Sequence, residues 1–504
     1  MKYLQGQHIL ILGLGSSGLA MTRWCAQMGA DVTVADTRES PANLQVLKSE
    51  LPEVQFKSGP FSANLIQGTS VRAVFASPGL APIETLPVIA AAQAMGLWVG
   101  GELSLFVQAL ENLKATRDYA PQVLAITGTN GKTTVTALTG QLIERAGKTV
   151  KVAGNIGPTL LDSLRLSMTT ALPEVWVLEL SSFQLDNAGP FEPSAATVLN
   201  ITQDHLDWHG NMAAYAAAKE KIFGASSLMV LNRDDARVMA MLPDPVRAKL
   251  QKPVIRAHIT YGAEMPQRPG DFGLETVNGM TWLVRALEAD ETRRLRKGEV
   301  EEIHIQRLMP ADALRIRGRH NAVNALAALA LATSTGASLA SMLFGLREYK
   351  GEPHRVEPVA IVNEVEYFDD SKGTNVGATV AALLGLGAER RVVVILGGEG
   401  KGQDFSPLAE PVARYARAVV LIGRDAPLIR EEIKACGVPL IDASTLPEAV
   451  NAAKNIAQAG DAVLLSPACA SFDMFRDYPH RAQVFCQAVA EIADTAGQSM
   501  EAAL

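Results

Sequence analysis

The chain has 504 residues, of which 48% are hydrophobic and 20% charged, a composition typical of a folded globular protein whose length predicts about three domains. A formal net charge of −7 argues against a nucleic-acid-binding surface, and no apolar run approaches the length of a membrane span, so we expect neither nucleic-acid binding nor membrane insertion. The four cysteines form no Cys-x-x-Cys pair and the first residues do not read as a signal peptide, which together predict a cytoplasmic protein.

The N-terminal residues have the pattern of a βαβ unit. Residues 8–12 predict a buried strand, followed by Gly13-x-Gly15-x-x-Gly18 and a helix. The next predicted strand ends in Asp36, an acid about 20 residues after the first glycine, as in dinucleotide-binding units. A third strand ends in the turn Ser77-Pro78-Gly79. We expect this unit to bind a phosphorylated or ribose-bearing molecule, and the pattern alone does not say that the molecule is NAD.

The stretch around residues 123–138 predicts a phosphate loop. A short apolar strand leads into Gly128-Thr-Asn-Gly131-Lys132-Thr133, and a helix follows directly. Backbone N–H groups and a helix N-terminus then face one anion, and Lys132 adds a mobile positive charge. Ile126 stands where the general motif has its first glycine, so the loop is shorter than usual. The alternative, an ordinary turn with a surface lysine, does not explain strand, glycines and helix in one register. The pattern predicts a nucleoside triphosphate site.

Two polar residues after this loop, Glu179 and His205, are candidates for the same site. Glu179 ends a predicted strand, the usual position for a Mg²⁺ partner of a phosphate loop, although a solvated strand-end glutamate remains the alternative. His205 follows the next strand and is a candidate for the nucleotide pocket. His209 reads as structural, and Leu206 stands where a His-Glu-x-x-His protease needs its glutamate. By itself, Lys219 reads as a solvated helix residue.

The second half of the chain contains one region without a clear pattern and one strongly patterned region. Residues 261–317 show little periodicity, and the charged stretch 288–302 predicts an exposed hairpin or flexible loop. Asn321 and Asn324 begin an Ala/Leu-rich helix, where they act as caps or read a base edge. Beyond about residue 352, strands alternate with helices, which predicts a doubly wound α/β domain.

These motifs together resemble those of the Mur ligase family. The shared set is Gly128-Thr-Asn-Gly-Lys-Thr133, Glu179-Leu-Ser-Ser-Phe-Gln184, Asp204-His-Leu-Asp207, Gly318-Arg-His-Asn-Ala-Val-Asn324 and Pro353-His-Arg355. Asp370-Ser-Lys-Gly-Thr-Asn375 and Leu465-Ser-Pro-Ala-Cys-Ala-Ser471 resemble the branch that adds D-glutamate. Other branches of the family typically have a histidine or tyrosine directly after the acid that corresponds to Asp370. The resemblance covers nearly the whole chain except the charged insert near 286–302.

The resemblance implies an α/β protein of three domains. They are a dinucleotide-binding-type, Rossmann-like domain for the UDP-substrate (1–115), a P-loop-type central ATPase domain (116–351) and a doubly wound C-terminal α/β domain for the incoming amino acid (352–504). The implied activity is ATP-dependent amide ligation of D-glutamate to UDP-N-acetylmuramoyl-L-alanine, through an acyl phosphate and a tetrahedral intermediate, in peptidoglycan precursor synthesis. ATP and two Mg²⁺ ions are the implied cofactors, and a monomer is expected.

The resemblance also assigns residues to this chemistry. Lys132 would contact the β- and γ-phosphates, Thr133 and Glu179 would ligate one Mg²⁺, and His205 with a carbamylated Lys219 would ligate the second, which replaces the surface interpretation of Lys219. The remaining ATP-binding residues of the loop are Gly128, Thr129, Asn130, Gly131 and Thr134. Asn321 and Asn324 would read the adenine, Arg355 would lie near the phosphates, and Asp370 would contact the ribose. The UDP group would contact Ser16, Ser17, Asp36, Thr37, Arg38 and Gly79, and the muramoyl part Asn155 and Gln184. D-glutamate would contact Lys372, Thr374, Lys401, Ser471, Phe472 and Tyr478. Glu399 stands where close relatives often have aspartate.

Three other functions would explain part of the sequence. An NAD(P)-dependent oxidoreductase would explain the first glycine motif but leaves the phosphate loop, Glu179 and His205 without a role. A non-catalytic P-loop switch leaves the polar turns of the last domain unexplained. Folylpolyglutamate synthase shares the phosphate loop, but the UDP-type first domain and the Asp370-Ser371-Lys372 run argue against it.

Overall fold

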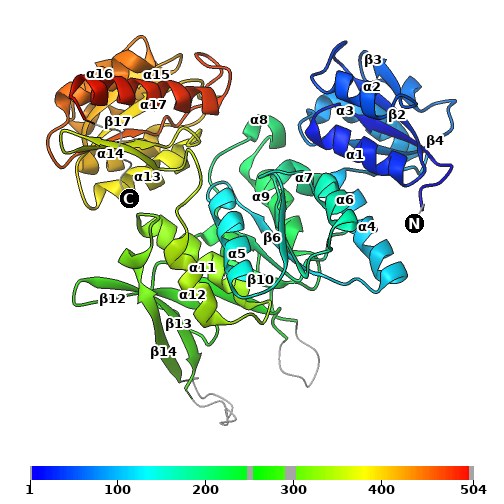
Figure 1. The fold of residues 1–504 in the computed structure, drawn as a ribbon, viewed down its shortest axis with the longest axis horizontal. Helices are drawn as coiled ribbons and strands as arrows, with labels where there is room; N and C mark the ends of the chain where they lie inside the picture. Colours follow the sequence, from blue (N-terminus) through cyan, green and yellow to red (C-terminus); the bar gives the residue numbers. More distant parts are fainter. Residues whose placement is uncertain (1–2, 247–253, 290–301, 499–504) are drawn as a thin grey trace. The chain divides into compact units, whose positions relative to one another are not determined.

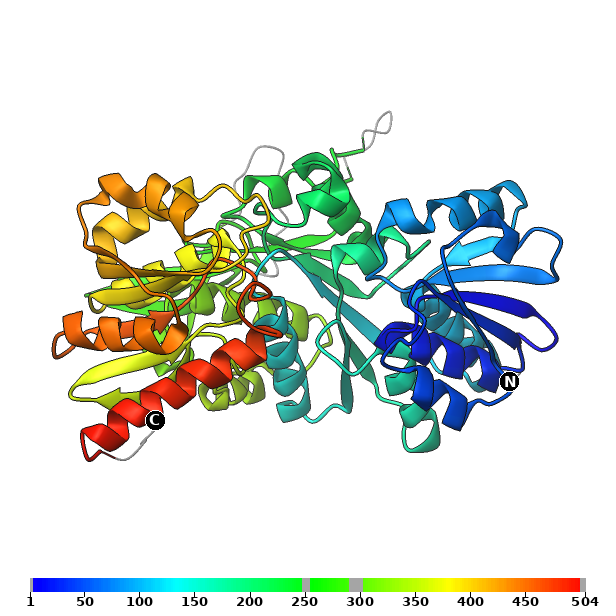
Figure 2. The same cartoon turned by 90° about the horizontal axis from the view of Figure 1, so that it is seen from above.

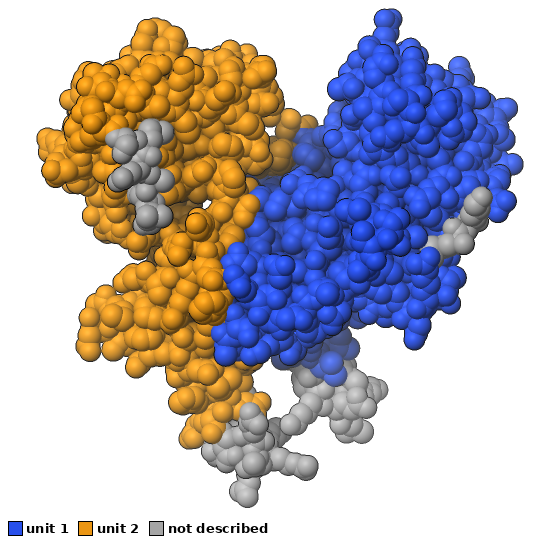
Figure 3. All heavy atoms as spheres, in the orientation of Figure 1, with its two compact units in different colours: residues 1–201, 208–261, 327–342 blue, residues 202–207, 262–326, 343–504 orange. Residues whose placement is uncertain are grey.

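The computed structural model describes residues 3–246, 254–289 and 302–498. The chain divides into two compact units, shown in blue and orange in Figure 3. Unit 1 contains residues 1–201, 208–261 and 327–342, and unit 2 contains residues 202–207, 262–326 and 343–504. Within the described residues four β-sheets form, two in each unit.

The first sheet of unit 1 is parallel, with the strand order β3-β2-β1-β4-β5. Alternate residues of β1 enter two different hydrophobic clusters, because successive side chains of a strand point to opposite faces. One cluster joins the sheet to α1 and α4, and the other joins it to α3 (Figure 1). The elements are β1 (His8–Leu12), α1 (Ser16–Gln27), β2 (Asp31–Asp36), α2 (Leu44–Glu50), β3 (Gln55–Ser58), β4 (Val71–Ala76), α3 (Pro82–Ala94), β5 (Trp98–Gly100) and α4 (Glu102–Arg117).

The central sheet of unit 1 is also parallel, with the order β11-β10-β9-β6-β8-β7. Its strands read as nearly continuous apolar runs, since helices cover both faces. The elements are β6 (Gln122–Thr127), α5 (Lys132–Arg145), β7 (Val150–Gly154), α6 (Leu160–Thr169), β8 (Val175–Glu179), α7 (Ser182–Asp186), β9 (Ala195–Val198), α9 (Met212–Glu220), β10 (Leu228–Asn232), α10 (Ala236–Met239) and β11 (His258–Tyr261). Three further helices, α8 (Leu206–His209), α11 (Arg319–Thr333) and α12 (Leu339–Glu348), each have residues in both units.

Unit 2 contains a small antiparallel sheet that the sequence did not reveal. It consists of β12 (Phe272–Val277), β13 (Met280–Glu288) and β14 (Ile303–Pro310). Along its strands, buried and partly exposed side chains do not alternate regularly, so the sequence shows no period-2 pattern there. Of the charged stretch 288–302, which we predicted to be an exposed hairpin or flexible loop, residues 290–301 lie outside the described part of the chain.

The second sheet of unit 2 has the order β15-β16-β20-β17-β18-β19, parallel except for the β15–β16 hairpin. Helices α16 and α17 lie side by side on one face, and α13, α14 and α15 pack on the other (Figures 1 and 2). The elements are β15 (Glu357–Val362), β16 (Val365–Asp369), α13 (Val376–Gly387), β17 (Val392–Gly397), α14 (Ala409–Tyr415), β18 (Ala416–Ile422), α15 (Ala426–Ile433), β19 (Leu440–Asp442), α16 (Leu446–Ile456), β20 (Ala462–Leu465) and α17 (Tyr478–Thr495).

The predicted α/β class is therefore confirmed, with doubly wound sheets at both ends of the chain. The strand predicted at 8–12 is β1, and the strands predicted to end in Asp36 and Glu179 are β2 and β8, which end at those residues. Among the described residues, none of the helices combines the length and apolar character needed to cross a lipid bilayer.

Candidate functional site

The phosphate loop joins β6 to α5 as the sequence predicted. Gly128 has a φ of +156° and approaches β9 so closely that an added Cβ would lie 2.9 Å from Leu199 Cβ, so only glycine fits this backbone. Gly131 is the N-cap of α5 with a φ of +83°. The Asn130 amide donates to Asn200 Oδ1 at 2.8 Å, and the Asn200 amide group donates back to the Asn130 carbonyl at 3.1 Å. The loop is thus tied to the end of β9, with the N-terminus of α5 behind it.

Two lysines contact this loop from different elements. Lys132 Nζ donates to the carbonyl oxygens of Gly128 and Thr129, both at 2.8 Å. Lys219 Nζ, from α9, donates to the Gly128 carbonyl at 2.9 Å and to Thr127 Oγ1 at 3.3 Å, and lies 4.7 Å from the Tyr215 ring centre. Lys219 is 1% exposed, so its surface interpretation is wrong and the structure brings it to the loop, as the family resemblance implied.

Glu179 is buried at the end of β8, and only one of its two carboxylate oxygens accepts a hydrogen bond from the described residues. Its Oε1 accepts a hydrogen bond from Asn155 Nδ2 at 2.7 Å, while the buried Oε2 has no hydrogen-bond partner among the described residues. A buried carboxylate oxygen without a partner is costly unless a cation or a donor joins it. Since Mg²⁺ prefers such oxygen ligands, Glu179 fits the predicted metal role, and its solvated alternative is wrong.

The residues predicted to hold the UDP group lie at the carboxyl ends of parallel strands β1, β2 and β4. Asp36 is buried there and accepts hydrogen bonds from the Leu14 amide at 2.7 Å and from Arg38 Nε and Nη2 at 2.8 Å. Burial alone would raise the pKa of Asp36, but these donors outweigh it and lower the pKa to about 2. Asp36 therefore stays ionised and orders the glycine loop. Ser16, Thr37, Arg38 and Gly79 are exposed at the same edge, and Ser17 is half-buried.

Gln184 and His209 are both engaged in structural contacts. Gln184 Oε1 accepts from the Ser181 amide at 2.9 Å, and the Gln184 amide donates to Ser181 Oγ at 3.2 Å, which forms a capping box for α7. His209 Nε2 lies 3.0 Å from Ser182 Oγ, and its ring stacks on Phe183. The structural interpretation of His209 is thus confirmed.

His205 belongs to unit 2 with Asp204. Its backbone is in the left-handed region at a φ of +54°, and its amide donates to Asp204 Oδ1 at 3.0 Å. The second oxygen of Asp204 accepts from Asn375 Nδ2 at 3.4 Å. The groups around Lys219 belong to unit 1, so the pairing of His205 with Lys219 stays a prediction.

The two asparagines predicted to read adenine lie in the first turn of α11. Asn321 Nδ2 donates to the Arg317 carbonyl at 2.8 Å, and Asn324 Nδ2 donates to Asn321 Oδ1 at 3.2 Å. Neither is the N-cap, because the helix begins at Arg319. Of the two alternatives from sequence, the cap is therefore wrong, and base reading stays a prediction.

The turn after β16 gathers buried acids. Asp370 Oδ2 accepts from Ser466 Oγ at 2.6 Å, and burial raises the pKa of Asp370 to about 7. Asp369 Oδ2 lies 2.7 Å from His354 Nδ1, while Asp369 Oδ1 accepts from the Ser371 amide at 2.8 Å. Burial raises the pKa of Asp369, an effect that His354 partly offsets. A three-member His/carboxylate group among the described residues consists of His354, Asp369 and Glu357, and the His354 amide donates to Glu357 Oε2.

Arg481, in the first turns of α17, holds this turn against the one after β20. Its side chain is 1% exposed and donates to Ser371 Oγ at 3.1 Å, to the Ser371 carbonyl at 2.8 Å and to the Cys469 carbonyl at 3.1 Å. These two turns carry Lys372 and Ser471 of the predicted D-glutamate pocket. The sequence did not single out Arg481, because an arginine in an amphipathic helix reads as a solvated residue.

The remaining residues of this predicted pocket pair lysines with aromatic rings. Lys372 Nζ lies 3.9 Å from the Tyr478 ring centre, and Lys401 Nζ lies 5.9 Å from that of Phe472. Phe472 is 64% exposed, whereas Ser471 is buried. Thr374 is half-buried in the same turn as Lys372. Glu399 pairs with Arg424 at 3.0 Å, and the Glu399 backbone bridges to Ala470.

Three domain profiles of known protein families match this chain. The profile described as Mur ligase MurD-like, N-terminal domain, matches residues 7–101, the Mur ligase middle domain matches 126–332, and the Mur ligase, glutamate ligase domain, matches 354–469. The chain therefore belongs to the Mur ligase family, and it contains all three of its domains. The boundaries at 115/116 and 351/352 stay predictions.

Two curated relatives and two solved structures define the likeness further. The chain is 69% identical, over 504 residues covering both chains fully, to the UDP-N-acetylmuramoylalanine–D-glutamate ligase of Albidiferax ferrireducens. It is 58% identical to that of Cupriavidus metallidurans over 98% of this chain and 99% of the relative. The fold resembles a MurF ligase from Thermotoga maritima solved with ADP (TM-score 0.56, 15% identity, covering 98% and 96% of the two chains). It also resembles the UDP-N-acetylmuramate-alanine ligase of the same organism (TM-score 0.54, 21% identity, covering 96% and 99%).

Proposed function

We propose that the chain is an ATP-dependent amide ligase that adds D-glutamate to UDP-N-acetylmuramoyl-L-alanine in peptidoglycan precursor synthesis. The observation that carries this function is the 69% identity, over 504 residues, to a ligase named for that reaction. The phosphate loop, with a buried carboxylate oxygen of Glu179 open to a cation, agrees with the use of ATP.

The reaction needs an activated carboxyl group. A carboxylate repels an incoming amine and has no good leaving group, so ATP first phosphorylates the carboxylate of the L-alanyl group. The amine of D-glutamate then attacks the acyl phosphate, and the tetrahedral intermediate collapses to the amide and inorganic phosphate. The residues of the site must bring an anionic carboxylate up to an anionic triphosphate.

The phosphate end of the site is assigned to the loop and its neighbours. Gly128 to Thr134 hold the triphosphate through backbone N–H groups, and Lys132 moves from the loop carbonyls onto the β- and γ-phosphates. Thr133 and Glu179 hold one Mg²⁺, and His205 with Lys219, as a carbamate, holds a second. Mg²⁺ supplies charge neutralisation and in-line alignment of the transfer when it is bound. A carbamate at Lys219 is supported by its burial beside the loop, where a carboxylate product would face Thr127 Oγ1.

The other ends of the substrates fall on the remaining predicted residues. Asn321 and Asn324 hold adenine, Arg355 the phosphates and Asp370 the ribose. Ser16, Ser17, Asp36, Thr37, Arg38 and Gly79 hold the UDP group, with Asn155 and Gln184 at the muramoyl part. The two lysine–aromatic pairs support a pocket for the two carboxylates of D-glutamate, formed by Lys372, Thr374, Lys401, Ser471, Phe472 and Tyr478. The protein acts as a cytoplasmic monomer.

Phosphate release from ATP by the purified protein tests this function. The reaction contains UDP-N-acetylmuramoyl-L-alanine and one of three amino acids, D-glutamate, L-glutamate or L-alanine. We expect turnover with D-glutamate alone. Turnover with another amino acid would keep the ligase chemistry and refute the D-glutamate pocket, whereas no turnover in protein that binds ATP would refute the ligase function.

A further inference from the structure

A buried acid outside the predicted site lies where α4 leaves the first sheet. Glu102 is 2% exposed in the first turn of α4, directly after β5. Its Oε1 accepts a hydrogen bond from the Leu161 amide at 3.0 Å, in the first turn of α6. Its Oε2 is buried and has no hydrogen-bond partner among the described residues. An acid at a helix N-terminus is favourable, but full burial with one oxygen unmatched is not needed for capping alone.

The same turn of α4 contacts a second helix of the central sheet. Ser104 Oγ donates to the Ala188 carbonyl at 2.7 Å, just beyond the end of α7, and also accepts from the Gly101 amide at 3.3 Å. One turn further, Phe106 packs edge-to-face on Trp176 of β8, with ring centres 5.2 Å apart. The start of α4 is therefore attached to α6, α7 and β8 at once, all within unit 1.

These contacts join the elements that carry the proposed UDP-substrate residues. Ser17 lies in the first turn of α1, and its side chain is one of the groups that favour the ionised form of Glu102 and so partly offset the rise of its pKa. The turn before α6 carries Asn155, and α7 carries Gln184. On the proposed function, the glycine loop holds the UDP end of the substrate, while Asn155 and Gln184 hold its muramoyl end.

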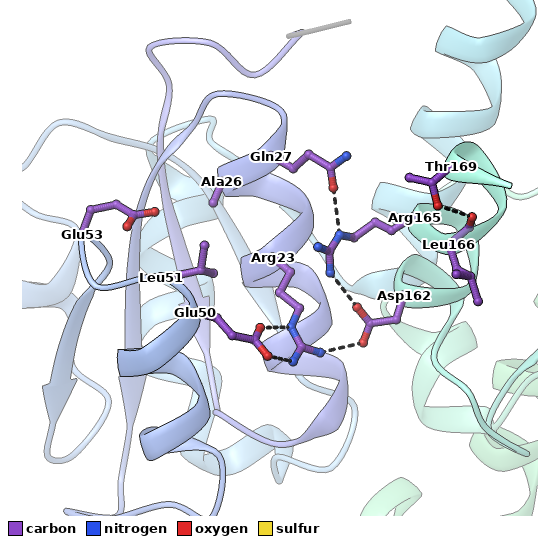
Figure 4. A pocket seen from close by; sticks show the side chains of 10 residues that line it. All are labelled: Arg23, Ala26, Gln27, Glu50, Leu51, Glu53, Asp162, Arg165, Leu166 and Thr169. Carbon is purple, nitrogen blue, oxygen red and sulfur yellow. Dashed lines mark hydrogen bonds and ion pairs between the residues drawn. The ribbon is translucent and has the colours of Figure 1, made fainter.

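Asp162, the charged group that acts on Glu102, belongs to a network of ion pairs between α1, α2 and α6 (Figure 4). Asp162 of α6 raises the pKa of Glu102, and it is itself paired with Arg23 of α1 and Arg165 of α6, at 3.1 and 3.0 Å. Arg23 also binds Glu50 of α2. Both arginines beside Asp162 are therefore engaged in ion pairs. Burial is the main reason that the pKa of Glu102 is raised to about 7, so the carboxyl changes charge near neutral pH.

We propose that Glu102 is a positioning residue for UDP-N-acetylmuramoyl-L-alanine: through its hydrogen bond to the N-terminus of α6, it sets the distance between the glycine loop and the muramoyl contacts. This inference rests on the proposed function and adds a residue to it. Glu102 contacts no substrate; it acts through the elements it joins. Ionisation at higher pH charges the unmatched Oε2 and weakens the junction, which lowers substrate affinity.

The test measures binding of UDP-N-acetylmuramoyl-L-alanine by calorimetry, and KM for each substrate, in three variants. Glu102→Ala removes the acceptor of the Leu161 amide, and we expect Kd and KM for the UDP-substrate to rise about tenfold. We expect KM for ATP and D-glutamate to change less than about twofold. Glu102→Gln keeps an acceptor oxygen, and we expect near-parental affinity that no longer falls between pH 6 and 8. Glu111→Ala, an exposed acid on the same helix, is the matched control.

The outcomes separate the inference from the proposed function. Equal changes in all three KM values, or an unchanged Kd in Glu102→Ala, would overturn the positioning role. If Glu102→Ala does not fold, a Glu102→Gln variant that keeps the parental pH dependence of Kd overturns it equally well. A parent protein that binds the UDP-substrate but does not turn over with D-glutamate refutes the proposed function and leaves the positioning test intact. A parent that does not bind the UDP-substrate refutes both.

Discussion

Arg481 is expected to be the most sensitive residue in the C-terminal part of the chain. Its guanidinium group is 1% exposed and donates three hydrogen bonds to two turns, one after β16 and one after β20. Arg481→Met keeps much of the volume and removes the charge and all three donors. The carbonyls of Ser371 and Cys469 and the Ser371 hydroxyl then lose a buried partner.

The magnitude follows from two opposing effects. Hydrogen bonds from a charged donor contribute about 1.5–3 kcal/mol each, so three contribute about 5–9 kcal/mol. Against this, burial lowers the pKa of Arg481 from 12.5 to about 10, which corresponds to a cost of about 3 kcal/mol for holding the charge inside. Arg481→Met should therefore lower the free energy of unfolding by about 2–6 kcal/mol.

Urea denaturation of the full chain, with phosphate release as a second measurement, checks this expectation. Arg347→Met, an exposed arginine on α12, is the control and should change the unfolding free energy by less than about 0.5 kcal/mol. Arg481→Lys keeps the charge but not the planar fork of donors, so it should fall between the two. Under conditions in which Arg481→Met is folded, its KM for D-glutamate should rise more than its KM for ATP. An Arg481→Met protein as stable as the control would refute the role assigned to these hydrogen bonds.

Three further changes have defined expectations. Glu102 has a pKa of about 7 in the folded chain and 4.5 in the unfolded chain, so its contribution to stability is full below pH 4.5 and is lost as the pH rises through 7. The loss is at most about 3 kcal/mol, and guanidinium denaturation from pH 5 to 8 should show it in the parent protein and not in Glu102→Gln. Gly140→Ala places a Cβ 2.5 Å from Val152 Cγ2 and should destabilise by about 1–3 kcal/mol, less the gain in helix propensity, and a stabilised variant would contradict the packing of α5 on β7. Chelation of divalent cations should lower phosphate release at least about 10³-fold, and Glu179→Gln should do the same without loss of ATP binding, whereas activity in EDTA would exclude the metal role.

Local patterns in the sequence determined most of the fold. The runs that became β2, β8 and β20 are short, apolar and bounded by glycine or polar turns, so the strand boundaries depend on a few neighbouring residues. The phosphate loop was equally local, since strand, glycines, lysine and helix lie within about 15 residues. The antiparallel sheet β12–β14 was missed because its strands are only partly buried and show no regular alternation.

Only the tertiary structure decided which residues are buried together. Lys219 reads as a surface residue in its helix, yet α9 packs it against the Gly128 carbonyl 91 positions earlier in the chain. Arg481 and Glu102 likewise gain their roles from partners far away, Ser371 and Leu161. The local sequence around a charged side chain does not indicate whether it is buried, because its environment depends on which distant elements pack over it. The sequence by itself determined the strands, the loop and the family, while the packing of those elements decided which charges are buried and what they hold in place.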